Sequence, residues 1–389
     1  MTAMSEPTAV PSPLRAPPRV DTSTVSQPLQ NLFAGWHKNL AQPFTGLTAT
    51  GAVDPDLFPL RETGVSLKPM RDAVEAFIAS LDDAQRKAVF FDVDGEVWRT
   101  WSNIHRNLMR HGLCLVELSE QQRELVYEIL RVSLGVAAYE TARASMRLNQ
   151  TLAEMTGLPL EFGEYFYWIS LFGEPSPDKP WGWQLDGHHC NINCFALGGQ
   201  MVLSPVLLGS EPVLAEAGKY KGLTVLREEE ARGLAFMGAL TALQRKLATI
   251  GMDLPFDGYA SGFQDNVVVP YAGVVSTSMT HAQRGQLLDL IKLYTQRLAP
   301  GQAEVRLAEV EAHFDETYFS WIGEFGDQVP FYYRVHSPVI FIEFYHQPGV
   351  ALPNTGYNRR HAHALVRTPN GNDYGWALLR QCRSSFPSP

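Results

Sequence analysis

The sequence predicts an α+β fold in which a unit of two helices followed by two strands occurs twice. Helix starts of one form recur in pairs, and a distinctive aromatic segment recurs in nearly the same form. Each copy of that segment leads into a run rich in aromatic and β-branched residues, which is typical of strands. We therefore expect mixed or antiparallel sheets flanked by helices, with the two units in a pseudo-twofold arrangement.

Four short segments share a capping residue in second position and end in Gln-Arg. They are LDDAQR at 81–86, LSEQQR at 118–123, LTALQR at 240–245 and MTHAQR at 279–284. A Ser, Thr or Asp side chain can accept a hydrogen bond from a free N–H of the first turn, and good helix formers follow it. Each segment predicts a helix start, and the chain continues with helical stretches at 121–155 and 282–312.

The aromatic segment YFYWISLFG at 165–173 resembles YFSWIGEFG at 318–326, with six of nine residues identical. Both segments follow a helical stretch, and both precede strand-like runs, at 181–197 and 331–346. We infer an internal duplication whose alignment places Asn193 against Glu343.

The rest of the chain separates into connecting segments. Residues 202–212 predict a strand, and residues 222–230 predict a strand that leads into a helix. The Gly-rich residues 252–278 predict a long surface loop with one short strand, and residues 347–358 predict another loop.

The domain organisation follows from these segments. Residues 1–27 are rich in Pro, Ser, Thr and Ala and predict a flexible tail. Residues 28–389 predict a single large α+β domain. It would be built from two repeats, at about 81–200 and about 240–346, plus a C-terminal HAH segment.

Composition narrows the class of protein. The chain of 389 residues is 45% hydrophobic and 19% charged, which are globular values, and its net charge of −9 argues against nucleic acid as a partner. No apolar run is long enough for a transmembrane helix, so we expect no membrane partner and a cytoplasmic location. Four cysteines in a chain of this length predict buried free thiols, and a homo-oligomer is left open.

The strongest chemical signal is His361-Ala-His363. If this segment is a strand, residues i and i+2 point to the same face, and two imidazoles on one face make a pair of metal ligands. The alternative is two surface histidines in a polar turn.

The second signal is Asp186-Gly-His188-His189. Adjacent residues on a strand face opposite sides, so at most one of the two histidines shares a site with the others. Parity places His188 with the apolar Cys190, Ile192 and Cys194, and His189 with the polar Asn191 and Asn193. His189 is therefore the better ligand candidate, while a structural role for either histidine is equally compatible with the sequence.

Glu343 is the sole charge in the run VIFIEFY, and a buried carboxylate needs a cation or a hydrogen-bond partner. The alternative is an outward-facing side chain in water. Together with His188 or His189, and with His361 and His363, it predicts a metal site of three or four ligands. Asp186, Glu343 and Arg334 are the candidate catalytic residues, with Arg334 holding an anionic group of the substrate. The candidates for substrate binding are Glu174, Trp181, Trp183 and Tyr333.

The order of these motifs resembles the largely bacterial family catalogued as domain of unknown function 3500. The resemblance covers about residues 72–380, and its most specific parts are PWGWQLDGHH, the FYYR–FIEF strands, and HAH followed by Asn372-Asp-Tyr-Gly375. The family pattern implies an acid at Asp186, the two following histidines and the HAH pair, all of which this chain keeps. After Glu343 the chain departs from the family's usual polar stretch.

We expect a metal-dependent enzyme of hydrolytic or lyase type that acts on a small organic substrate. The metal would be a divalent transition metal (zinc, iron or manganese), since imidazoles and one carboxylate suit all three. No Gly-rich phosphate loop occurs, so we expect no nucleotide cofactor. The alternatives are a mononuclear iron or copper oxidoreductase and a non-catalytic ligand-binding protein with structural histidines.

Overall fold

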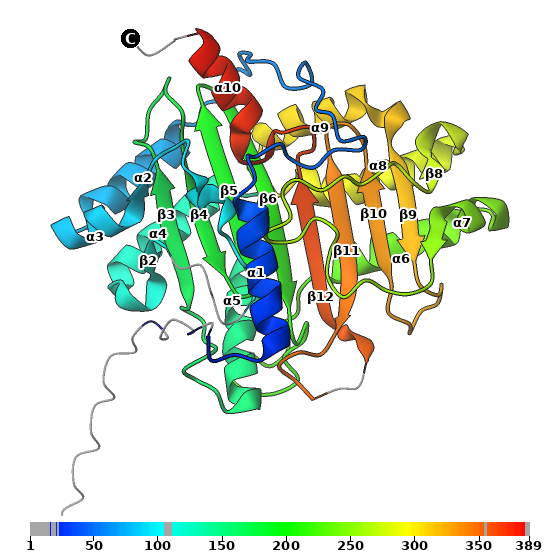
Figure 1. The fold of residues 1–389 in the computed structure, drawn as a ribbon, viewed down its shortest axis with the longest axis horizontal. Coiled ribbons are helices and arrows are strands. Elements are labelled where there is room, and N and C mark those ends of the chain that lie inside the picture. Colours follow the sequence, from blue (N-terminus) through cyan, green and yellow to red (C-terminus); the bar gives the residue numbers. More distant parts are fainter. Residues whose placement is uncertain (1–15, 17–20, 22, 105–110, 354–355, 386–389) are drawn as a thin grey trace, which may run out of the picture.

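A single large mixed sheet organises the chain, and helices and irregular segments cover its two faces (Figure 1). The computed structural model describes residues 16, 21, 23–104, 111–353 and 356–385. Most of the tail predicted at 1–27 lies outside these residues, and the first helix begins at Gln27. The expected α+β class is confirmed.

The sheet has twelve strands. In the first half of the chain they are β1 (Phe90–Phe91), β2 (Leu113–Cys114), β3 (Tyr167–Phe172), β4 (Trp181–Gly187), β5 (Cys190–Leu197) and β6 (Gln200–Ser210). In the second half they are β7 (Thr249–Gly251), β8 (Val274–Val275), β9 (Tyr318–Ile322), β10 (Tyr332–His336), β11 (Phe341–Pro348) and β12 (Tyr357–Arg367).

The strand order is β1-β3-β4-β5-β6-β12-β11-β10-β9-β7, with β2 added to β3 and β8 added to β9. β6 and β12 pair antiparallel at the centre. On either side of them lies a run of three antiparallel strands, and each run ends at a short parallel edge strand, β1 or β7. The last strands of the two halves therefore meet in the middle of the sheet.

The helices are α1 (Gln27–Leu40), α2 (Lys68–Ala79), α3 (Asp83–Val89), α4 (Glu120–Ser133), α5 (Val136–Thr156), α6 (Arg227–Ala239), α7 (Ala242–Ala248), α8 (His281–Thr295), α9 (Gln302–Ala312) and α10 (Trp376–Ser385). In Figure 1, α5, α6 and α8 lie behind the sheet, whereas α1 crosses in front of it. Within the described residues, none of these helices combines the length and the apolar character that a membrane crossing requires.

The four predicted helix starts are confirmed at α3, α4, α7 and α8. Each helix is capped by a Ser, Thr or Asp side chain, and the Gln at its third position bonds back to the cap. The glutamines also pair across helices. Gln122 donates to Gln85 and Gln283 donates to Gln244, each at 2.9 Å, so that each cap is tied to a second one.

The alternation along the strands separates an apolar face from a polar face. In β5, the fully buried Cys190, Ile192 and Cys194 alternate with Asn191 and Asn193. The apolar face packs against helices, while α1 and irregular chain cover the polar face (Figure 1). A polar surface under loops rather than under helices is where a site can form.

Two expectations about connecting segments need correction. Residues 222–226 form no strand beyond an isolated bridge from Leu214 to Thr224, because Gly222 bends the chain back so that its N–H bonds to Ala215. The segment 252–278 is also less superficial than its composition predicts. Ala260 to Phe263 are buried, because this segment lies over the polar face of the sheet.

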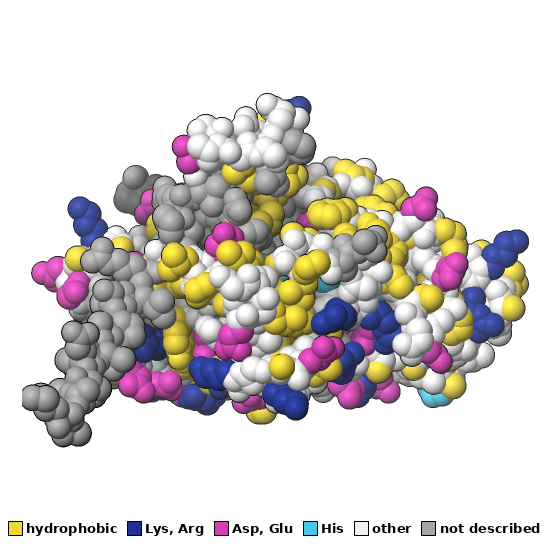
Figure 2. All heavy atoms as spheres, turned by 90° about the horizontal axis from the view of Figure 1, so that it is seen from below, with side chains coloured by type: hydrophobic (Ala, Val, Ile, Leu, Met, Phe, Trp, Pro, Cys, Tyr) yellow, Lys and Arg dark blue, Asp and Glu magenta, His cyan; other side chains and the backbone are white. Residues whose placement is uncertain are grey.

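Figure 2 shows one end of the molecule, where acidic and basic side chains are intermixed with hydrophobic ones. Neither sign of charge dominates this face.

An ionic contact lies within the helix-covered layer. Glu230 of α6 accepts hydrogen bonds from Nε2 of His346 at 3.0 Å and from Nε of Arg359 at 2.6 Å. Burial raises the pKa of the carboxyl, but these hydrogen bonds outweigh burial and lower the pKa to about 2.

We expect Glu230→Gln to destabilise the protein by about 3 kcal/mol near neutral pH. Because the pKa of Glu230 is lower in the folded state, its carboxylate stabilises the fold at pH values above the ordinary pKa of 4.5. This stabilisation is lost as the pH falls toward 2. The difference in melting temperature between the variant and the wild type should therefore become smaller as the pH is lowered from about 6 to about 3. The control is Glu228→Gln on the same helix, whose exposed pair with Arg232 should contribute little at any pH. A difference that stays constant with pH would contradict the prediction.

Candidate metal centre

The hairpin between β4 and β5 presents the first histidine of the site. His188 and His189 form its two-residue turn, and His189 has φ +62°. This left-handed conformation costs a non-glycine residue about 1 kcal/mol or more. The backbone on either side is anchored, because Tyr167 donates to the carbonyl of His188 at 2.9 Å and the N–H of Gly209 donates to that of His189 at 2.8 Å.

The central strand β12 contributes the other two histidines of the site. His361 and His363 are two residues apart and lie on one face, while Ala362 and Ala364 face the other way. Nε2 of His361 lies 3.1 Å from Nε2 of His189. One ligand atom from each of His189, His361 and His363 lies within 4.8 Å of the others, and all three residues are buried.

The ring of His361 is oriented by its surroundings. Nδ1 lies 2.9 Å from the carbonyl oxygen of Pro348, which can only accept, so Nδ1 carries the proton and Nε2 presents its lone pair to the cluster. The carboxylate of Glu211 lies 3.8 Å from Nδ1. It is held by the backbone N–H groups of Val350, Ala351 and Leu352 at 3.0, 3.0 and 3.1 Å.

Glu211 was not found by sequence reasoning. The available signal was an acid beside a proline at the end of a predicted strand, which is a weak one. A carboxylate behind a histidine that faces a cluster is typical of the outer shell of metal sites.

Neither ring nitrogen of His363 has a hydrogen-bond partner within the described part of the chain. Its ring lies over Gly209, where a Cβ would come within 2.3 Å of Cδ2. On the other side the ring of Tyr345 lies 5.0 Å away, centroid to centroid. Burial lowers the pKa of both His361 and His363, with neighbouring histidines adding to the effect at His363. Neutral imidazole is the form that binds metals.

The model of one protein family matches residues 63–376 of this chain, and its description is "Protein of unknown function (DUF3500)". The chain belongs to this family. Neither the search of curated proteins nor that of solved structures found a match.

In this member of the DUF3500 family, the remaining candidate ligands lie outside the cluster. Nδ1 of His188 bonds to Oδ1 of Asn149 at 2.8 Å, and its ring stacks on that of His189 at 3.8 Å. The carboxylate of Glu343 is engaged elsewhere. It accepts from Tyr332 Oη at 2.7 Å and from the N–H groups of Tyr259 and Ala260 at 2.8 and 3.1 Å.

Asp186 lies at the end of β4, three residues before His189. Its Oδ1 accepts from the N–H of Ser102 at 2.9 Å and from the Asn191 amide at 2.5 Å. Burial raises the pKa of the carboxyl to about 7, although both hydrogen bonds oppose that shift. A carboxyl with this pKa can exchange a proton near neutral pH.

The structure separates the candidate substrate residues from the cluster. Trp181, Trp183 and Tyr333 are buried in the hydrophobic core of the helix-covered face, and Tyr333 bonds to Tyr294 Oη at 2.7 Å. Glu174 is exposed just beyond the end of β3. Parity explains this placement, because these aromatic residues alternate with the polar residues of the other face.

Gly209 gives a direct test of the packing around His363. We expect Gly209→Ala to displace the imidazole, because the added Cβ would also meet the backbone oxygen of Ala362 at 2.8 Å. The unfolding free energy should fall by about 1–3 kcal/mol, and metal affinity should fall with it. Gly285→Ala in α8 is the control, since a Cβ there meets nothing within 4 Å. Thermal melts and metal titrations that are the same for both variants would contradict this packing.

Proposed function

We propose that His189, His361 and His363 bind one divalent transition metal, and that the protein is a metal-dependent enzyme of hydrolytic or lyase type acting on a small organic substrate. The proposal rests on the three buried imidazoles of His189, His361 and His363, which lie close together. The ring nitrogens of His363 have no partner among the described residues. A buried polar group without a partner is costly, and a bound cation would remove that cost.

The distance between the rings of His189 and His361 fits a shared metal ion and also fits a hydrogen bond between them. Tetrahedral zinc places its nitrogen ligands about 3.3 Å apart, close to the 3.1 Å between His189 and His361. The ligand atoms of all three histidines lie within 4.8 Å of one another. The strained backbone of His189 and the orienting carbonyl behind His361 also favour a functional role.

The donor set narrows the choice of metal. With Glu343 bonded elsewhere, the site offers imidazole ligands only, which suits zinc, iron or copper better than manganese. Three protein ligands leave a coordination position open for water or substrate, and a metal there can lower the pKa of bound water to about 7. We propose Asp186 as the group that exchanges a proton, because its raised pKa suits that role and it lies three residues before His189.

We also infer that the two halves of the sheet arose by internal duplication. The equivalent order of strands from each edge and the four capping boxes support this inference. The register of the strands supports it as well. Gln184 lies opposite Asn193 in the β4–β5 pair, and Arg334 lies opposite Glu343 at the equivalent place in the β10–β11 pair. The cluster would then lie near the junction of the two repeats, where β6 meets β12.

Elemental analysis of the purified, tag-free protein tests the proposal, provided that no chelator is used before the measurement. We expect close to one equivalent of metal per chain. Zinc would direct the search to hydrolytic and lyase reactions. Copper or iron would favour the second candidate, an oxidoreductase, because a three-imidazole site suits both metals. A folded, metal-free protein whose melting temperature is unchanged by added metals would overturn the proposal and favour a ligand-binding protein.

A further inference from the structure

A second group of buried polar side chains lies on the same face of the sheet, on strands β9 and β10. Arg334 lies directly opposite Ser320 in the ladder, and His336 follows two residues later on the same face. Nε of Arg334, Oγ of Ser320 and both ring nitrogens of His336 have no hydrogen-bond partner in the described part of the chain. The three residues are 3%, 1% and 1% exposed.

Arg334 forms no ion pair with another described residue, although its charge partly offsets the rise in pKa that burial causes at the nearby Glu343 carboxyl. No carboxylate of the described residues lies within 4.0 Å of its guanidinium, and its one hydrogen bond goes from NH2 to the carbonyl of Pro270 at 3.5 Å. Glu343 lies opposite it in the ladder, but the oxygens of Glu343 accept from Tyr332 and from the backbone of residues 259–260. A buried cation in this condition is expensive unless an anion compensates it.

The other half of the sheet provides an internal comparison. There Ser170 occupies the place of Ser320, and Gln184 that of Arg334. Ser170 Oγ bonds to Nδ1 of His111 at 2.9 Å, and Gln184 donates to the carbonyl of Trp98 at 2.9 Å. Both residues of the first half are neutral and form a side-chain hydrogen bond, although Oε1 of Gln184 has no partner among the described residues. In the second half one residue is a cation, and neither Oγ of Ser320 nor Nε of Arg334 has a partner in the described part of the chain.

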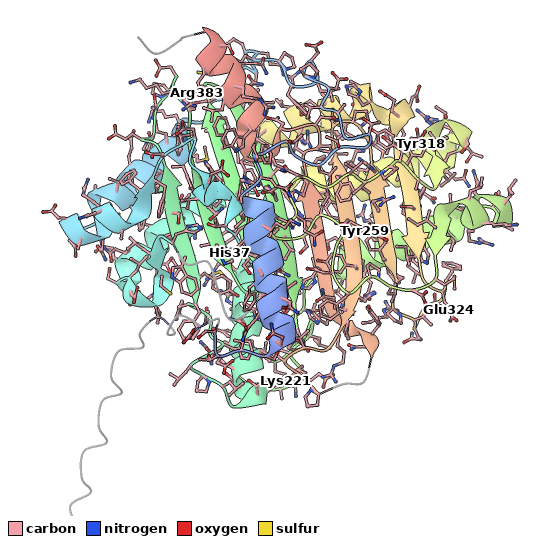
Figure 3. All side chains as sticks on the ribbon, viewed as in Figure 1. His37, Lys221, Tyr259, Tyr318, Glu324 and Arg383 are labelled. Atoms are coloured by element: carbon pink, nitrogen blue, oxygen red, sulfur yellow. The ribbon has the colours of Figure 1, made fainter. Side chains whose placement is uncertain are left out.

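Aromatic rings surround the unbonded groups. The guanidinium of Arg334 lies 5.7 Å from the ring centre of Tyr259, and the ring of His336 lies 4.5 Å from that of Tyr271. Tyr271 in turn stacks on Tyr318 at 5.2 Å. Figure 3 shows Tyr259 in front of the sheet and Tyr318 at the upper end of its strand. The covering segment reaches the surface at Pro270, which is exposed.

We propose that Arg334, Ser320 and His336 form a binding site for the carboxylate of a small organic molecule whose apolar part packs against Tyr259 and Tyr271. A guanidinium matches a carboxylate with two parallel hydrogen bonds, and a hydroxyl and a neutral imidazole supply further donors. A single buried cation fits a monoanion better than a phosphate dianion. The site does not depend on the metal proposed at the histidine cluster.

The test is calorimetric titration of the full-length protein, as purified, with benzoate, with its neutral analogue benzamide and with inorganic phosphate. We expect saturable binding of one benzoate per chain, and no comparable binding of benzamide or phosphate. Ser320→Ala should weaken benzoate binding by about tenfold, since a hydrogen bond to a charged group is lost. Arg334→Gln should abolish detectable binding.

Matched variants distinguish a binding role from a structural one. Ser320→Ala should leave the melting temperature of the ligand-free protein unchanged, because this hydroxyl has no hydrogen-bond partner to lose among the described residues. Ser170→Ala should lower the melting temperature, since it loses the bond to His111, but should leave benzoate affinity intact. Any one of four results would overturn the proposal. These are equal binding of benzoate and benzamide, benzoate binding that survives in Arg334→Gln, preferred binding of phosphate, and no binding of benzoate.

Discussion

We expect His363→Ala and His361→Ala each to lower the metal content of the purified protein from about one equivalent per chain to a trace, while the protein stays folded. Each substitution deletes one of the three proposed ligands, and two imidazoles hold a divalent ion far less tightly than three. The cavity left by one imidazole costs stability. In His363→Ala the apo form also loses the cost of burying a ring whose nitrogens have no partner among the described residues, whereas His361→Ala also loses the hydrogen bond to the carbonyl of Pro348. We therefore expect a large loss of metal with a modest change in the apo melting temperature.

The matched control for this prediction is His336→Ala. His336 is also a buried strand histidine on the polar face, and neither of its ring nitrogens has a partner in the part of the chain that the structure describes, but it lies outside the cluster. Its removal should leave the metal content unchanged. Plasma mass spectrometry and circular dichroism on the three variants measure both quantities. Retention of full metal content in His361→Ala and His363→Ala would place the metal elsewhere, and a metal-free wild type with destabilised variants would assign the histidines a structural role.

We expect Arg367→Met to destabilise the protein by about 3–5 kcal/mol, because among the described residues it leaves the buried carboxylate of Asp373 without a cation and Asp265 with Arg99 alone. Arg367 is fully buried at the end of β12 and bonds through Nε to Asp373 at 2.8 Å and through NH2 to Asp265 at 2.5 Å. Arg99 contacts the same Asp265 at 2.8 Å. This buried network ties the covering segment 252–278 and the C-terminal segment to the central strand.

An exposed ion pair gives the contrast. Lys68 and Asp72 lie one turn apart on α2, and both side chains are about half exposed or more. Lys68→Met should change the unfolding free energy by less than about 0.5 kcal/mol. Chemical denaturation of both variants measures the difference. If Arg367→Met lowered the unfolding free energy by less than about 1 kcal/mol, which is the size expected for a surface ion pair, the network would not depend on this side chain.

Local chemistry explains why much of the fold could be predicted. The four helix starts depend on a side chain that reaches N–H groups within three residues, so their signal lies entirely within each short segment. The division of β5 into two faces follows from strict alternation. The segments 222–230 and 252–278 were harder to predict, because their conformation depends on the surfaces that they cover.

The candidate site divides in the same way. Parity singled out His361 with His363, and His189 rather than His188, and the structure brings these three together. It does not bring Glu343 to them. A lone acid in an apolar run indicates that the side chain requires hydrogen-bond partners, but it does not identify them. Here the partners include backbone N–H groups more than eighty residues earlier in the chain.

The sequence by itself determined the class of the fold, the places where helices begin, the faces of the strands and the pair of histidines on β12, since each depends on neighbours within a few residues. Only the tertiary structure decided that His189, 172 residues from His361, completes the cluster, and that Glu343 and Arg334 lie apart from it. The physical reason is the sheet order. The pairing of β6 with β12 sets which side chains meet, and it is fixed by the packing of the whole chain rather than by any local pattern.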